Sequence, residues 1–108
     1  MNRHEPARVV LVGGGYVSVW AARAMRRWAG GRVQVTLIAP DPVHVFHGWT
    51  GEVVAGDLPV QAVLTPLAEA VPSARLVRGR VVRVDREARL VSVRSAEGTV
   101  SAIPYDHL

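Results

Sequence analysis

The chain has 108 residues, about the length of one domain, and it is 49% hydrophobic and 20% charged. This composition is typical of a folded globular unit and excludes a disordered one. The chain contains no cysteine, which excludes disulfides, thiolate metal sites and a dithiol redox pair within it and favours an intracellular setting. The apolar run Val9–Val12 is too short for a signal peptide or a membrane span.

The formal net charge is +4, and every strongly basic residue is an arginine. Between residues 78 and 94 these arginines alternate with valines and leucines, as on a solvated sheet face. No aromatic residues are interleaved with them to stack on bases, so nucleic acid is not expected as a partner. Attraction to an anionic membrane surface stays open.

The first predicted element is a strand over Arg8–Val12, and its lack of alternation predicts burial on both faces, as in a parallel sheet. A helix is predicted from about Gly15 to Trp28. A second strand is predicted over residues 32–40, closed by Pro40. The unit is therefore β-α-β. The apolar stripe predicted to face the sheet consists of Val17, Ala21, Ala24 and Trp28.

Three glycines lie between the first strand and the helix, and two of them meet different physical needs. A sharp strand-to-helix turn requires φ freedom at Gly13. A pyrophosphate approaching the backbone requires a missing side chain at Gly15, with the helix N-terminus facing its negative charge. The string G-x-G-x-x-S is weak evidence alone, but its position between a buried strand and a helix favours dinucleotide binding.

Two positions depart from the dinucleotide-binding fingerprint. Ser18 stands where a third glycine allows close helix–strand packing, although it is small enough to be accommodated. Ala39 stands where an acidic residue would bind a ribose hydroxyl. Asp41, two positions later, either substitutes from the loop or simply belongs to the turn APDP, and we favour the turn.

Residues 43–58 are rich in aromatic residues, histidine and glycine. Phe46 and Trp49 are either core side chains or part of a functional segment, and both interpretations stay open. A zinc site at His44 and His47 lacks further ligands and is not expected. No serine–histidine–acid arrangement stands out.

A further helix is predicted over residues 57–71, with a kink or restart at Pro66. A third strand is predicted at residues 74–79. Three more strands near residues 80–85, 89–94 and 99–103 are joined by short turns into an antiparallel meander.

Together these stretches resemble the flavoproteins with two dinucleotide-binding domains, in particular the type II NADH dehydrogenase-like FAD-dependent pyridine nucleotide oxidoreductases. The resemblance covers residues 8–108 and rests on VVLVGGGYVSVWAA, VTLIAPDP, HVFHGWTGEVVAGDL, ARLVRGRVVRVDREARLVSV and the closing IPYDHL. It implies an α/β, Rossmann-like fold with a parallel β-α-β sheet and an inserted meander. Residues 1–108 would be the N-terminal portion of an FAD-binding domain, incomplete as a domain and about the first third of an enzyme.

The resemblance also implies which residues contact FAD. The pyrophosphate would lie on the glycine backbone, Ala39 and Pro40 would border the ribose, and the residues after Gly79 would lie beside the adenine. Phe46, His47 and Gly48 would approach the flavin. No catalytic acid or base and no metal ligand is implied. The full implied set is Gly13, Gly14, Gly15, Tyr16, Val17, Ala39, Pro40, Phe46, His47, Gly48, Arg80 and Val81.

The implied activity is that of an NAD(P)H-dependent oxidoreductase passing hydride through FAD to a quinone or another small-molecule acceptor. A cytoplasmic location, peripheral association with the inner face of the membrane and a homodimer are compatible with it. The alternatives are a sulfide:quinone reductase-like flavoenzyme and a non-catalytic nucleotide-binding or interaction module. A one-domain NAD(P)-binding protein would fit the β-α-β unit but not the meander.

Overall fold

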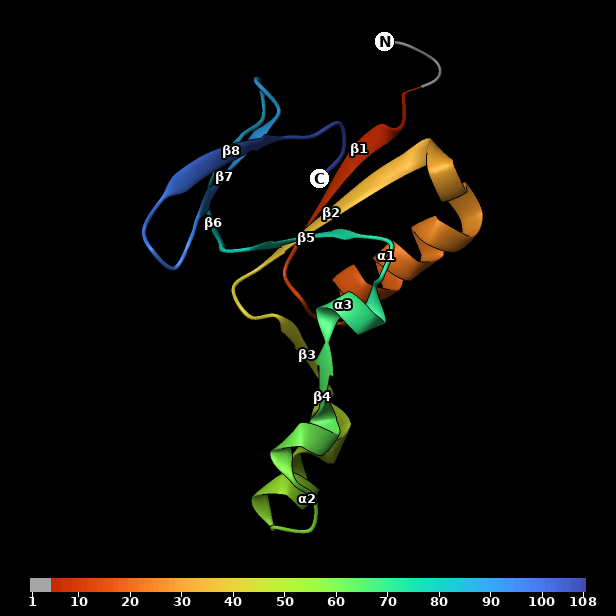
Figure 1. The fold of residues 1–108 in the computed structure, drawn as a ribbon, viewed down its shortest axis with the longest axis vertical. Coiled ribbons are helices and arrows are strands. Elements are labelled where there is room, and N and C mark those ends of the chain that lie inside the picture. Colours follow the sequence, from red (N-terminus) through yellow and green to blue (C-terminus); the bar gives the residue numbers. More distant parts are fainter. Residues whose placement is uncertain (1–4) are drawn as a thin grey trace.

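The computed structural model describes residues 5–108, which form three layers (Figure 1). The central layer is a parallel sheet of order β1-β2-β5, built from β1 (Ala7–Val12), β2 (Val33–Ala39) and β5 (Arg75–Arg78). One face is covered by α1 (Tyr16–Ala29), which ends in a 3-10 turn at Gly30–Arg32, and by α3 (Leu67–Ala70). The other is covered by an antiparallel meander of β6 (Arg80–Asp85), β7 (Leu90–Arg94) and β8 (Val100–Pro104). The predicted fold class is confirmed.

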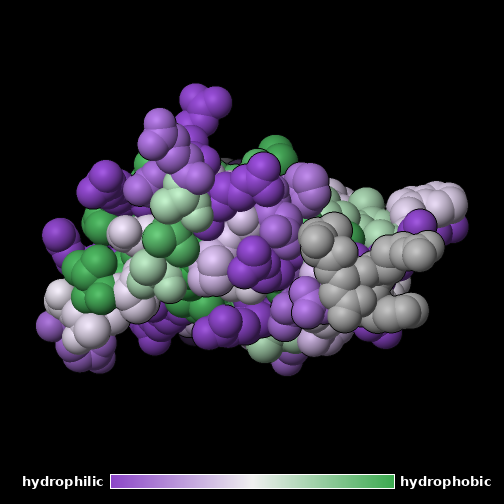
Figure 2. Space-filling view, turned by 90° about the horizontal axis from the view of Figure 1, so that it is seen from above, coloured by the Kyte–Doolittle hydropathy of each residue, from purple (hydrophilic) through white to green (hydrophobic). Residues whose placement is uncertain are grey.

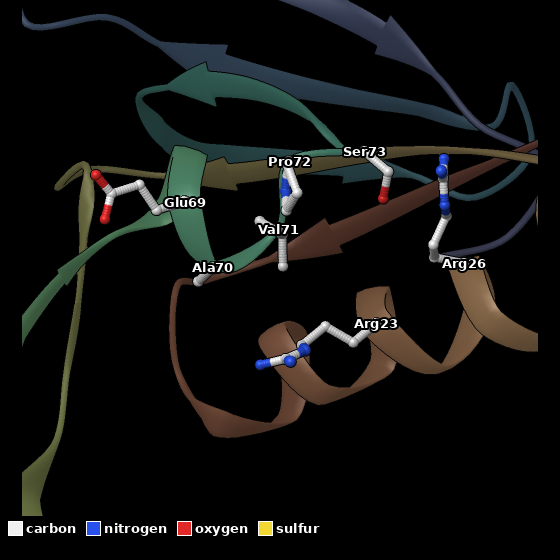
Figure 3. A pocket seen from close by; sticks show the side chains of 7 residues that line it. All are labelled: Arg23, Arg26, Glu69, Ala70, Val71, Pro72 and Ser73. Atoms are coloured by element: carbon white, nitrogen blue, oxygen red, sulfur yellow. The ribbon is translucent and has the colours of Figure 1, made fainter.

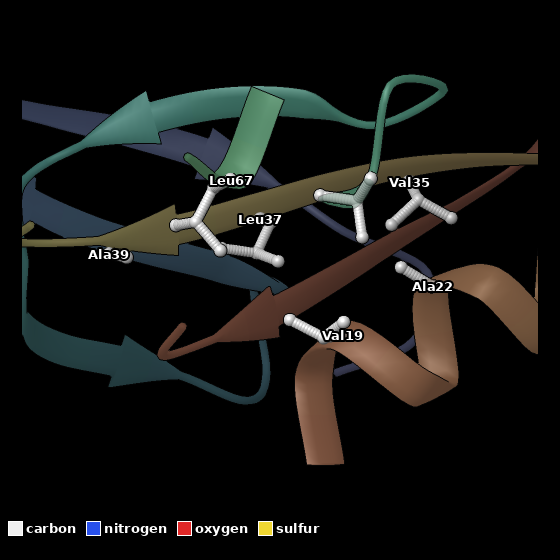
Figure 4. Packing of buried hydrophobic residues seen from close by; sticks show 7 residues of the cluster. Val19, Ala22, Val35, Leu37, Ala39 and Leu67 are labelled. Atoms are coloured by element: carbon white, nitrogen blue, oxygen red, sulfur yellow. The ribbon is translucent and has the colours of Figure 1, made fainter. Parts of the chain in front are cut away.

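Two hydrophobic clusters hold the layers together. In β2, Val35 and Leu37 face α1, whereas Ile38 faces the meander, because successive residues of a strand point to opposite faces. Figure 4 shows the first cluster, in which Leu67 of α3 lies over Leu37 and Val19 of α1 approaches from the helix side. The first strand was predicted to be buried on both faces, but the strand that is buried on both faces is β2. In β1, which lies at the sheet edge, only Val10 is fully buried.

The face that α1 turns to the sheet differs from the predicted stripe. Val17 is 84% exposed and Trp28 is 72% exposed, whereas Ser18, Val19 and Ala22 are buried. The small residues let the helix approach β2 closely, and the two large indoles of α1 remain outside. Each indole lies under a guanidinium group, with Arg23 at 5.3 Å from the Trp20 ring and Arg27 at 5.2 Å from the Trp28 ring.

The prediction of a single helix over residues 57–71 is wrong. This stretch forms a 3-10 turn at Val60–Val63, then β4 (Leu64–Pro66), and finally the short helix α3. Pro66 ends β4 immediately before α3, so the predicted restart at this proline does occur. The segment becomes a strand because it pairs antiparallel with β3 (Val43–Val45), a tertiary contact that overrides the helical spacing.

We call residues 43–66 the arm, because they project from the sheet at the bottom of Figure 1. Between β3 and β4 the arm contains a 3-10 turn at His47–Trp49 and the helix α2 (Thr50–Val54). Phe46 is 41% exposed and Trp49 is 49% exposed. The structure therefore contradicts the interpretation of these two residues as core side chains.

The meander follows the predicted turns. Asp85 accepts a hydrogen bond from the Ala88 amide, and Ser95 accepts one from the Thr99 amide. Its arginines are exposed, as predicted. Figure 2 shows a mostly hydrophilic face with hydrophobic atoms gathered on the side of the meander. Within residues 5–108, no helix combines the length and the apolar character needed to cross a membrane.

Candidate nucleotide-binding site

The turn between β1 and α1 has the backbone conformation predicted from its glycines. Gly13 has a φ of 100°, a left-handed conformation that favours glycine. Its amide donates to the Ile38 carbonyl at 2.7 Å, which ties the turn to the end of β2. The chain then enters α1 with Gly15 at the N-cap.

Gly15 has no structural reason of its own to be glycine. Its φ is −81°, which any residue adopts, and a Cβ placed on it would meet no protein atom within 4 Å. By contrast, a Cβ on Gly14 would lie 3.2 Å from Cδ1 of Leu67. The open space beside Gly15 is what a ligand that contacts the bare backbone requires.

The N-terminus of α1 is suited to bind an anion. Its first turn has no acidic residue and no side-chain cap. Within the described part of the chain, no acceptor is found for the amides of Gly15, Tyr16 and Val17. These unpaired donors and the helix dipole together attract negative charge.

A cleft of about 220 Å³ opens beside this turn. It brings together six residues of the predicted cofactor-binding set with four that were not part of it. The six are Gly14, Gly15, Tyr16, Ala39, Pro40 and His47, and the four are Asp41, Val43, His44 and Val45. The predicted set is thus gathered in part at the carboxyl end of the parallel sheet, where open α/β sheets bind ligands.

The arm forms one wall of the cleft, and two of its histidines contact Tyr16 of α1. The backbone amide of His47 donates to the Tyr16 hydroxyl at 3.1 Å. The ring of His44 stands edge-on to the Tyr16 ring at 4.8 Å, and its Nδ1 lies 2.9 Å from the Gly14 carbonyl oxygen. In the sequence, the only signal for His44 was its place in the histidine-rich segment.

The other predicted residues lie outside this cleft. Val17 faces solvent, and Phe46 and Gly48 lie further along the arm, with the Phe46 ring over Gly48. Arg80 lines a second cleft of about 300 Å³, together with Arg78 and Gly79, and Pro40 borders both clefts. Val81 packs against the cluster beneath the meander.

The two departures from the fingerprint have different structural outcomes. Ser18 is buried, and its hydroxyl donates to the Val12 carbonyl at 3.4 Å, so the polar side chain is satisfied at the helix–strand contact. Ala39 is buried, and its side chain offers no polar group. Asp41 lies in the turn after β2 and also lines the cleft, so the two interpretations of this residue are compatible.

A larger cavity, of about 440 Å³, lies elsewhere (Figure 3). Arg23 and Arg26 line it from α1, and residues 69–73 line it from the opposite side. It contains neither the glycine turn nor the free amides of α1, so its size does not make it the nucleotide site. Within the described residues, no group of three or more histidine and acidic side chains could hold a metal ion.

The β-α-β unit, the glycine turn and the unpaired helix amides define a dinucleotide-binding fold of the Rossmann type. No protein-family model and no curated protein matches the chain. Several solved structures match the chain in their fold. The sulfide:quinone oxidoreductase from the hyperthermophilic bacterium Aquifex aeolicus matches with a TM-score of 0.75 and 23% identity, over 93% of this chain and 23% of that one.

Two further matches show the same fold at lower identity. NDH2 from Plasmodium falciparum in complex with NADH has a TM-score of 0.76 and 14% identity, over 93% of this chain and 21% of that one. An engineered water-forming NADPH oxidase bound to NADPH is derived from the Lactobacillus brevis enzyme. It matches with a TM-score of 0.81 and 17% identity, over 92% of this chain and 23% of that one. The chain thus spans less than a quarter of these three proteins. At these identities the matches show a shared fold, which is the fold that the resemblance implies.

Proposed function

We propose that this chain binds FAD as the N-terminal portion of the FAD-binding domain of an NAD(P)H-dependent oxidoreductase. The observation that carries the proposal is the bare backbone at Gly15, which faces open space beside the unpaired amides of α1. The neighbours that carry NADH and NADPH support the nucleotide class. FAD, when bound, would accept hydride from the reduced nicotinamide and pass electrons to a quinone or another acceptor.

In this proposal the chain contributes binding and orientation. The amides of Gly15 and Tyr16 donate to the pyrophosphate, and no carboxylate in the first turn of α1 opposes its charge. The Asp41 carboxylate would accept a hydrogen bond from a ribose hydroxyl, because the position where an acidic residue is expected is occupied by Ala39. Pro40 borders both clefts, and the second cleft, which Arg80 lines, would hold the adenine beside the backbone of Arg80 and Val81.

The arm provides the flavin side of the proposed site. Phe46, His47 and Gly48 lie beyond Tyr16, and all three residues are exposed rather than covered by this chain. We therefore expect a bound flavin to reduce the exposure of Phe46. The arm would contribute by excluding water from the flavin with the rings of Phe46 and His47.

A second candidate is a sulfide:quinone reductase-like enzyme, which is favoured by the similarity to the Aquifex aeolicus protein. It shares the FAD site and differs in the electron donor. Peripheral membrane association is part of the proposal in both cases, because a quinone acceptor is dissolved in the bilayer.

The first test is the visible absorption spectrum of the protein produced from its natural reading frame, before and after NADH is added under nitrogen. Flavin bands that bleach with NADH support the proposed reductase, and bands that bleach only with sulfide support the second candidate. A folded product that holds no flavin and takes up none when FAD is added overturns the FAD assignment and favours the non-catalytic module.

The variant Gly15→Ala tests the site itself. A methyl group at this position meets no protein atom. Stability should change by no more than about 1 kcal/mol, because the smaller freedom of the unfolded chain is offset by alanine being a poorer N-cap than glycine. FAD affinity should fall at least tenfold, because the methyl occupies the space beside the amides. Gly31→Ala is the matched control, since its Cβ also meets nothing and it lies at the other end of α1. Equal FAD affinity in both variants would contradict the site.

A further inference from the structure

His44 makes an unusual link between the arm and the glycine turn. Its ring is half-buried, and its Nδ1 lies 2.9 Å from the carbonyl oxygen of Gly14, 30 residues earlier in the chain. A carbonyl oxygen only accepts, so the hydrogen bond requires the proton on Nδ1. The same ring stands at 84° to the Tyr16 ring, with the centroids 4.8 Å apart.

The peptide group held by this bond is otherwise free. On one side, the Val12–Gly13 peptide is fixed by Ile38 and Ser18. On the other side, the Gly15 carbonyl accepts from the Val19 amide at 3.1 Å. For the peptide between Gly14 and Gly15, His44 is the only hydrogen-bond partner in the described part of the chain.

The orientation of that peptide decides what the turn offers to an anion. In a trans peptide the C=O and the following N–H lie in one plane and point in opposite directions. A bond that holds the Gly14 carbonyl therefore also sets the direction of the Gly15 N–H. Both residues lack a Cβ, so a rotation of this peptide would meet little steric resistance. Such a rotation would present a carbonyl oxygen where the amide had been.

We propose that His44 is a positioning residue for the glycine turn: its Nδ1–H holds the Gly14 carbonyl, which keeps the Gly15 amide directed at a pyrophosphate. This inference rests on the proposed FAD function and adds a preorganising contact to it. The edge-on contact with Tyr16 and the hydrogen bond from the His47 amide to the Tyr16 hydroxyl hold the arm in place for this role.

Two variants separate the hydrogen bond from the shape of the ring. His44→Phe keeps a ring against Tyr16 but removes the donor. His44→Asn removes the ring but places an amide donor close to the position of Nδ1. His107→Phe is the control, because His107 is exposed and its hydrogen bonds with Val10 and Arg8 are made by its backbone. FAD affinity is measured by flavin fluorescence, and folding by the urea midpoint.

We expect His44→Phe to weaken FAD binding about tenfold, the effect of one directed hydrogen bond. His44→Asn should recover most of this loss, and the urea midpoints of the two variants should not follow their affinities. If His44→Phe binds FAD as tightly as His107→Phe, the inference is overturned. A loss that His44→Asn does not recover and that follows the urea midpoint would also overturn it, because the role would then be structural.

A measurement without FAD tests the inference independently of the cofactor. The ring ¹⁵N shifts of His44 in the free protein should report the Nδ1–H tautomer, and the Gly15 amide resonance should shift in His44→Phe more than in His107→Phe. An Nε2–H tautomer, or a Gly15 amide that does not respond, overturns the positioning role. If both signals are seen but the wild-type protein binds no FAD, the proposed function is overturned, whereas the hydrogen bond between His44 and Gly14 is confirmed.

Discussion

The layered body of the protein and its arm are built in different ways. In the body, segments far apart in the sequence cover one another, and Leu37 at the centre of the sheet is 1% exposed. In the arm, β3 and β4 pair with each other, Val63 is the one buried residue, and large side chains such as Phe46, Trp49 and Val54 remain exposed. Both hydrophobic clusters therefore belong to the body, and the arm contributes no residue to either of them. The cleft lies where the two meet.

The largest expected effect is on the body. Leu37→Ala removes a fully buried side chain between the sheet and α1, and we expect it to lower the free energy of unfolding by about 3 kcal/mol, because the close-packed surroundings cannot fully collapse into the cavity. Urea unfolding of the full chain measures this change. A loss below about 1 kcal/mol would show that the body is not the cooperative core that the burial pattern indicates.

A pair of glycines compares the two regions by the same chemical change. A Cβ on Gly79, at the corner between β5 and β6, would lie 2.5 Å from Cγ1 of Val93 and 2.9 Å from the Arg94 carbonyl oxygen. Gly79→Ala should therefore cost about 1–3 kcal/mol through overpacking.

The arm supplies the control for this change. A Cβ on Gly51, in α2, would meet nothing within 4 Å, and Gly51→Ala should be neutral or stabilising by up to about 1 kcal/mol, since alanine favours a helix. Thermal unfolding of both variants tests the comparison. A similar loss of stability in both would mean that the arm is packed as tightly as the body.

An ion pair joins the start of the body to the residues that follow the meander. The Arg8 guanidinium donates to both carboxylate oxygens of Asp106, at 3.2 and 3.1 Å, and the Arg8 amide donates at 2.7 Å. The side-chain bond, followed by the backbone bond, lowers the pKa of Asp106 to about 2. The ordinary value is about 3.9, so the folded state binds the proton less well than the unfolded state.

The sign of the pH dependence follows from this lowered pKa. The stabilisation is fully present above about pH 4 and is lost as the pH falls toward 2. Asp106→Asn should therefore lower the urea midpoint at pH 7, and the difference from wild type should shrink between pH 4 and pH 2. Asp57→Asn, at an exposed arm carboxylate, is the control. A difference that is constant with pH would contradict the ion-pair explanation.

The smallest expected effect is on the arm. Trp49→Ala removes a side chain that is half exposed, so the free energy of unfolding should change by no more than about 0.5 kcal/mol. Chemical unfolding without added nucleotide measures this change. A loss above about 1 kcal/mol would show that the arm folds as part of the body and would remove the contrast.

Much of the fold could be predicted from the sequence because the relevant signals are local. The run before Gly13, the second strand and the turns at residues 85–88 and 95–98 are encoded by adjacent residues, and all appear in the structure. The need for φ freedom at Gly13 belongs to the same class, because a sharp turn after a strand leaves few backbone conformations.

Tertiary structure decided the rest. The buried face of α1 depends on how closely the helix approaches β2, and small residues there exclude Val17 and Trp28 from the core. Residues 64–66 become a strand because β3 lies beside them, which helical spacing cannot indicate. His44 meets the Gly14 carbonyl only after the arm folds back against the turn. The sequence by itself determined the glycine turn, the β-α-β unit and the meander, whereas the partners of the turn were decided by contacts between distant segments, which no local pattern encodes.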